Sequence, residues 1–286
     1  MKNYQDFCNT ISQQLFEIIN KQGSLLSWHK NWESRGSQAL PVGIKGTYHG
    51  ANLFHLLFVQ FKQGFQSNEW LTFNQIKQQG GQVKKGAKSQ KVFFWKLNLK
   101  TENKEAQQEK NQETLKKPTP IFKLYSVFNL EQTTLEKTET ITLPTPCTTI
   151  EEFIKHLKVE VAHYGNKAFY ESQEDAIILP KPELFHSQEN YYATLLHELV
   201  HWTGNPNRVP RDCFVDYSKN LEARAKEELI AEIGAVFLAM HFGLKAELEN
   251  HASYVQSWKQ LLSEKDILQA THKAAQIFEW LIGQGE

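Results

Sequence analysis

The stretch TLLHELVHWTG, residues 194–204, decides how the rest of the chain is interpreted. It contains the pattern HExxH, formed by His197, Glu198 and His201. Histidines four residues apart on a helix lie on one face about one turn apart, so both imidazoles can bind one metal ion. The glutamate between them can reach a bound water and act as a general base. The pattern predicts a helix with a metal site and a catalytic Glu198, although five-residue patterns also arise by chance.

A third ligand would distinguish a metal site from a chance pattern. The extended form HExxHxxGxxH fails, because Gly204 is present but Asn207 stands where the last histidine should be. A later, otherwise apolar helix supplies Glu227, Glu228 and Glu232 instead. We expect Glu228 to be the third ligand and Glu232, on the same face, to hydrogen-bond a ligand histidine, with Glu227 as the alternative ligand.

Two histidines and one carboxylate leave one coordination position open. This arrangement is typical of a hydrolytic zinc site, not of a structural one. The expected ion is Zn²⁺. Mn²⁺, Fe²⁺ and other divalent ions are the alternatives, because such donors bind several metals.

Composition indicates a globular protein of two domains. The chain has 286 residues, of which 40% are hydrophobic, and it lacks a long apolar run. The N-terminal segment has neither the basic start nor the apolar core of a secretory signal, so we expect a cytoplasmic protein with no membrane association. The three cysteines are widely separated and suggest free thiols.

The two halves differ in charge. Residues 1–130 contain 18 Lys and Arg against 8 Asp and Glu, a net charge of +10, whereas residues 131–286 contain 14 against 24, a net charge of −10. The asymmetry suggests that the first half meets a polyanion, although two solvated surfaces can also differ in sign by chance.

The pattern of the first half predicts a small mixed α+β domain over residues 1–135. We expect an N-terminal helix, a helix after Asn52, a short strand and helix ended by Gly80 and Gly81, and two paired strands. Residues 100–119, between those two strands, are almost free of apolar side chains and predict a flexible loop inside the domain.

A Thr- and Pro-rich linker over 136–148 leads to a mainly helical domain with a short sheet over 149–286. Residues 149–165 are expected to be one helix with acidic residues in its first turn. Two short strands with a turn at SQED follow, and then helices near 188–203, 220–242 and 250–282. The predicted fold class is therefore α+β, with two domains.

Basic and aromatic residues occur close together in GGQVKKGAKSQKVFFWK, residues 80–96. Lysines neutralise phosphates, and aromatic rings stack on unpaired bases, as in proteins that bind single strands without sequence preference. Half the aromatic residues of a strand must face a core, however. The candidate DNA-binding residues are Lys84, Lys85, Lys88, Lys91, Phe94 and Trp95.

Five motifs occur in a characteristic order along most of the chain. They are YHGANLFHLLF, WLTFNQIKQQGGQVKKGAKSQKVFFW, YSVFNLEQT, HELVHWTG and KEELIAEIGAVFLA. In these motifs the chain resembles the ArdC-like antirestriction proteins of conjugative plasmids and related mobile elements.

The resemblance implies a single-stranded DNA-binding domain joined to a zincin-like metallopeptidase domain, and a role in protecting transferred DNA from host restriction. It makes His197 and His201 metal ligands, Glu198 the catalytic carboxylate and the EELIAE glutamates the source of the third ligand. The expected partners are single-stranded DNA and a protein substrate in the host restriction machinery. Asn205 departs from the family, which often has histidine there. The alternative is a non-enzymatic protein that coats single-stranded DNA and whose metal site is structural or vestigial.

Overall fold

The computed structural model describes residues 6, 9–11, 13, 14, 17, 40–98, 119–136, 146–244 and 261–285. Residues 95–98, 119–122, 146–148 and 285 are described by their backbone only. Residues 100–118 of the loop predicted over 100–119, most of the linker and residues 250–260 of the last predicted helix lie outside the described residues. Most of the predicted N-terminal helix also lies outside the described residues. Those of its residues that are described are helical, and Ile11 is fully buried.

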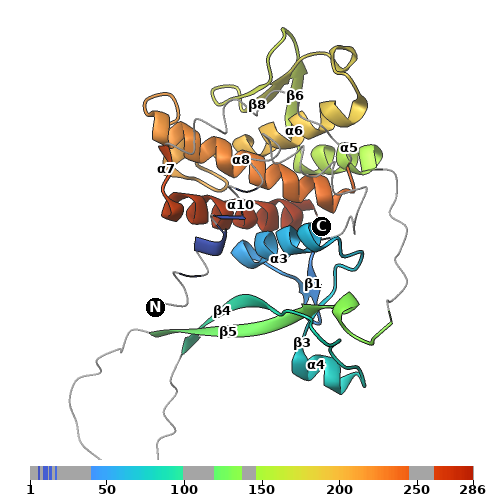
Figure 1. Cartoon of the computed structure of the whole chain (residues 1–286). Coiled ribbons are helices and arrows are strands. Elements are labelled where there is room, and N and C mark those ends of the chain that lie inside the picture. The colour runs from blue at the N-terminus through green and yellow to red at the C-terminus, as the bar shows by residue number, and fades with distance from the viewer. Residues whose placement is uncertain are drawn as a thin grey trace, which may run out of the picture.

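The first half is built around helix α3 (Gly50–Gln63), which lies between a small sheet and the C-terminal helix α10 (Glu264–Gly285) (Figure 1). A continuous buried run from Leu53 to Gln60 makes up the middle of α3, as expected for a helix covered on more than one side. The helix ends at Gly64, whose left-handed φ of 70° suits a glycine. Asn52 fixes α3 to the sheet, since its amide nitrogen donates to the Phe93 carbonyl at 2.6 Å and its oxygen accepts from the Phe93 N–H at 2.8 Å.

The sheet of the first half has the strand order β3-β5-β4, with both pairs antiparallel. The two long strands β4 and β5 form the hairpin that the sequence predicts, with Phe94 opposite Lys123 and Val92 opposite Tyr125. A two-stranded ribbon, β1 and β2, precedes α3. The strands and short helices of this half are β1 (Val42–Gly43), β2 (Gly46–Thr47), β3 (Trp70–Thr72), α4 (Phe73–Gln78), β4 (Gln90–Asn98), β5 (Thr119–Asn129) and η1 (Leu130–Gln132).

The second half packs a three-stranded sheet and short helices against the long helices α6, α8 and α10. Strand β8 is central, parallel to β6 and antiparallel to β7. The fold class is thus α+β, as predicted. The elements before α10 are α5 (Pro146–Leu157), β6 (Glu160–His163), β7 (Phe169–Glu171), β8 (Ala176–Leu179), η2 (Pro182–Leu184), α6 (Gln188–Trp202), α7 (Asp212–Val215) and α8 (Leu221–His241).

The prediction of one helix over 149–165 is wrong in two respects. Helix α5 starts at Pro146 and has no acidic residue in its first turn, and it ends at Leu157. Lys158 then adopts a left-handed φ of 56°, and the chain continues as strand β6 beside β8. The local apolar pattern is compatible with a helix. The β-branched Val159 and Val161 also favour a strand, and pairing with β8 stabilises the strand instead of a longer helix.

A single cluster of buried apolar side chains extends through both halves of the chain. It includes Leu53 and Leu57 of α3 together with Ile267, Ile277 and Leu281 of α10. At the surface of this contact, His49 Nδ1 lies 3.0 Å from Glu279 Oε1. The two halves therefore share one hydrophobic core.

No helix within the described ranges is both long and apolar enough to span a membrane.

Candidate metal centre and nucleic-acid interface

Helix α6 places both histidines of the HExxH pattern on its buried face. The helix begins after Ser187, whose hydroxyl accepts a hydrogen bond from the Asn190 N–H. His197, Glu198 and His201 are 3%, 7% and 7% exposed, respectively. Imidazole and carboxylate groups at such depth need polar or metallic partners, because burial of an unpartnered polar group is costly.

Helix α8 supplies these partners by crossing close to α6. Its first turn is capped by Asn220, whose side-chain oxygen accepts from two backbone N–H groups. Gly234 allows the close approach, since a Cβ atom at this position would lie 2.8 Å from Val200 Cγ2. The glutamates on the N-terminal side of this contact thereby reach the two histidines.

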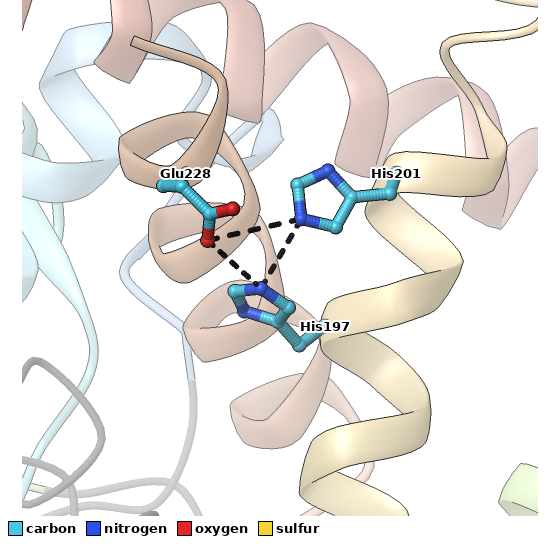
Figure 2. Close-up of side chains that lie close together, drawn as sticks. All are labelled: His197, His201 and Glu228. Atoms are coloured by element: carbon cyan, nitrogen blue, oxygen red, sulfur yellow. Dashed lines mark hydrogen bonds and ion pairs between the residues drawn. The ribbon is translucent and has the colours of Figure 1, made fainter. Parts of the chain in front are cut away.

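Three donor atoms converge between the helices (Figure 2). His197 Nε2 lies 3.2 Å from His201 Nε2 and 3.5 Å from Glu228 Oε2, and His201 Nε2 lies 4.0 Å from the same oxygen. Ligands about 2.1 Å from a tetrahedral ion are separated by about 3.4 Å. The donors thus have nearly the separations that a tetrahedral ion requires.

A chain of buried polar groups contacts His201 through the Nδ1 atom of its imidazole. Its Nδ1 lies 2.9 Å from Glu227 Oε1, and the guanidinium of Arg211 donates to both oxygens of Glu227, at 2.6 and 2.7 Å. Burial opposes the charge on Glu227, but Arg211 and His201 lower the pKa of this carboxyl to about 2. The ionised Glu227 accepts a hydrogen bond from Nδ1–H of His201, an arrangement that leaves the Nε2 lone pair directed at the site.

His197 lies among three carboxylates. Glu228 is nearest, Glu232 Oε1 is 4.0 Å from Nδ1, and Glu198 is the next residue of the same helix. Burial alone would lower the pKa of His197, but the hydrogen bond with Glu228 and the charges of Glu232 and Glu198 raise it to about 9. Surroundings that favour a protonated imidazole favour any cation at this place.

Tyr217 contacts the carboxylate of Glu228. Its hydroxyl donates a hydrogen bond to Glu228 Oε1, while Oε2 is the oxygen that faces the histidines. Burial and the negative charge of Glu228 raise the pKa of Tyr217, so the hydroxyl keeps the proton that it donates. Tyr217 therefore fixes the orientation of the carboxylate.

The structure brings His197, His201 and Glu228 together, as the sequence analysis expects of a ligand set. Glu232 lies beside His197 at a distance longer than a hydrogen bond, whereas Glu227 is the glutamate that hydrogen-bonds one of the two histidines, His201. Sequence reasoning missed Arg211 and Tyr217 completely. Both precede α8 in a segment with no periodic pattern, and only their contacts reveal them.

Asn205, at the position where the sequence departs from the family, takes part in a separate polar contact. Its amide nitrogen lies 3.3 Å from the Tyr170 hydroxyl and 3.4 Å from Asp175 Oδ1. Asp175 also pairs with Arg208, whose guanidinium stacks over the Trp202 ring. These contacts connect the β7–β8 turn to the end of α6.

The candidate DNA-binding residues are distributed over more than one surface. Lys85 and Lys88 are exposed, Lys84 donates to the Glu131 carbonyl at 2.9 Å, and Lys91 donates to Ser126 Oγ at 2.6 Å. Phe94 is 48% exposed.

Trp95 pairs with Phe122 in the hairpin, and its side chain lies outside the described residues. Because side chains of a strand alternate between faces, Phe94 and Lys91 lie on opposite sides of the hairpin.

An HExxH helix crossed by a second helix that supplies a glutamate defines a zincin-like domain, here joined to a small α+β domain. Family models describe the same two parts. Residues 148–276 match a zincin-like metallopeptidase, and residues 1–128 match the N-terminal domain of the anti-restriction factor ArdC.

Solved structures resemble the whole chain. A metal-free crystal structure of the antirestriction ArdC protein from the R388 plasmid is 29% identical, with a TM-score of 0.75 over 100% of this chain and 98% of that one. The Mn(II)-bound structure of the R388 protein is 28% identical, with a TM-score of 0.73 over 99% and 97%. The chain therefore belongs with the ArdC-like antirestriction proteins.

A DNA primase, TraC of Escherichia coli, is also similar. It is 30% identical over 99% of this chain, which spans only 20% of the primase's length.

Proposed function

We propose that this chain is an antirestriction protein that binds single-stranded DNA with its first half and hydrolyses peptide bonds at the metal centre of its second half. The observation that carries the proposal is the spacing of three donor atoms, His197 Nε2, His201 Nε2 and Glu228 Oε2, at 3.2 to 4.0 Å. This spacing suits an ion with an open coordination position, as in hydrolytic sites.

Each residue of the centre has a separate role in this proposal. His197, His201 and Glu228 hold the ion, which supplies Lewis acidity when bound. Glu198 accepts a proton from the attacking water and passes it to the leaving amine. Glu227 orients His201 through Nδ1 and is itself held by Arg211.

The proposed ion is Zn²⁺. Two imidazoles and one carboxylate also accept Mn²⁺, and the R388 relative has a Mn(II)-bound structure. Competition between the two ions for the metal-free protein, followed with a chromophoric chelator, decides between them. Tighter binding of Mn²⁺ than of Zn²⁺ would contradict the assignment.

The partners follow from the charge distribution and the family. The net charge of +10 on residues 1–130 favours a polyanion, and the proposed ligand is single-stranded DNA. The proposed protein substrate belongs to the host restriction machinery. The bound DNA strand would bring this substrate near the peptidase site.

The decisive variant is Glu198→Gln, which keeps the size of the side chain but removes the base. It should bind metal and single-stranded DNA like the wild type and lose both peptide hydrolysis and protection from restriction. Glu152→Gln, at an exposed position of α5, is the matched control and should keep all four properties. If Glu198→Gln still protects fully, the peptidase proposal fails, and DNA coating is the whole activity.

A further inference from the structure

A large groove separates the sheet of the first half from the helices of the second. Its volume is about 2090 Å³, and it is lined by the β1–β2 ribbon, the β4–β5 hairpin, α7, α8 and α10. Pockets for small ligands have volumes of roughly 300 to 1,000 Å³. The size of the groove therefore fits a segment of a polymer better than a small molecule.

Three aromatic rings lie together on the sheet side of this groove. Phe94 and Tyr125 are 48% and 41% exposed, and their ring centroids are 5.4 Å apart. Tyr48 extends the group, with its ring centroid 6.5 Å from that of Phe94. Neighbouring aromatic rings that remain exposed in a folded chain indicate a binding surface.

Positive charge accompanies these rings. Lys123 is exposed and stands opposite Phe94 in the hairpin register, and Lys45 is exposed at the tip of the β1–β2 ribbon. Among the residues described, neither lysine has an ion-pair partner. On the opposite wall, Lys226 lies 2.8 Å from carboxylate oxygens of both Glu222 and Asp266, so its ammonium offsets one of these two negative charges.

We propose that this groove is the path of single-stranded DNA, with bases stacked on Phe94 and Tyr125 and phosphates held by Lys45 and Lys123. The inference rests on the proposed function and gives its DNA-binding site. Stacking requires unpaired bases, so the groove should prefer a single strand to a duplex. The opposite face of the hairpin, which carries Lys91, lies outside this path.

The hairpin offers matched variants on its two faces. Tyr125→Ala and Lys123→Gln change the groove face, and Leu124→Ala, at an exposed neighbouring position of the other face, is the control. Lys91→Gln, on that other face, tests the alternative path through the lysines of residues 84–91. Each full-length variant is titrated into a fluorescein-labelled oligothymidylate of roughly 16 nucleotides, the upper site size of single-strand-binding folds. Anisotropy is measured at two salt concentrations, and circular dichroism checks that each variant is folded.

Tyr125→Ala should weaken binding roughly 5- to 150-fold, the usual effect of removing one stacking ring. Lys123→Gln should weaken binding and reduce its salt dependence, and Leu124→Ala should bind like the wild type. A wild type without single-strand binding would refute the proposed function and the groove together. Normal wild-type binding that only Lys91→Gln weakens would refute the groove alone.

A crosslinking measurement tests the same path without any substitution. An oligonucleotide that contains 5-iododeoxyuridine is irradiated with the full-length protein, and the crosslinked peptides are identified by mass spectrometry. Crosslinks at Phe94, Tyr125 or Tyr48 support the groove. Crosslinks confined to residues 84–91 would overturn it.

Discussion

Replacing Arg211 with Met should both destabilise the fold and loosen the metal centre. The Arg211 side chain is almost completely buried. Its guanidinium donates to Glu227, to Thr203 Oγ1 and to the carbonyls of Val200 and Val209. Methionine has a similar length but no charge, so it leaves the fully buried carboxylate of Glu227 without a cation.

The expected cost follows from this burial. Removing one partner of a buried ion pair typically costs about 3 to 5 kcal/mol, because the other charge remains without compensation. Arg211→Met together with Glu227→Gln should cost less than the sum of the two single variants, by roughly 2 kcal/mol, since no uncompensated charge remains. Lys219→Met is the matched control, because it breaks an exposed ion pair with Asp216 that is worth at most about 1 kcal/mol.

Urea unfolding of the metal-free protein, followed by tryptophan fluorescence, measures the free energy of unfolding. Metal affinity is measured separately by competition with a chromophoric chelator. It should fall about 10- to 100-fold in Arg211→Met, since loss of a group that orients a ligand typically has this effect. A loss of stability below about 1 kcal/mol, or strictly additive single variants, would refute the buried network.

Three further predictions concern packing, ligand orientation and pH. Gly234→Ala should cost about 1 to 3 kcal/mol by forcing α8 away from α6, whereas Gly283→Ala, where a Cβ meets nothing within 4 Å, should not destabilise in the same urea titration. Tyr217→Phe should lower metal affinity while leaving the far-ultraviolet circular dichroism unchanged; unchanged affinity would show that the hydroxyl does not orient Glu228. The pKa of His197 is raised from 6.5 to about 9, so its contribution to the stability of the metal-free protein is complete below pH 6.5 and is lost as the pH rises through 9. Metal and proton compete for this imidazole, so metal affinity should rise about tenfold per pH unit over that interval, and a flat profile would contradict the shift.

Local patterns predicted much of the fold. The helices around residues 188–203 and 220–242 follow from their apolar period and caps, and the β4–β5 hairpin follows from its β-branched and aromatic content. Strand β6 was missed because its pairing with β8 is a tertiary contact between residues that a local pattern does not relate.

The convergence of His197, His201 and Glu228 could be anticipated because HExxH and the i, i+4 spacing of Glu228 and Glu232 are properties of single helices. The hydrogen bond between Glu227 and His201 depends on how α6 and α8 cross, which no local pattern specifies. Arg211 enters from a connecting segment for the same reason.

The aromatic part of the groove could not be predicted without knowledge of the strand register. Phe94 and Tyr125 are separated by the whole segment between β4 and β5, and only the pairing of the two strands brings their rings to 5.4 Å. Sequence reasoning consequently concentrated on neighbours of Phe94 in the chain.

The hydrophobic core shared by α3 and α10 makes the two halves depend on each other for folding. A fragment that stops near residue 135 would lack the α10 side chains that share one buried apolar cluster with Leu53 and Leu57 of α3. Each fully buried leucine contributes about 1.5 to 3 kcal/mol, so a few of them equal much of the stability of an ordinary domain. The first half is therefore an unsuitable unit for separate expression, and transplanting it to another protein would require a substitute for α10.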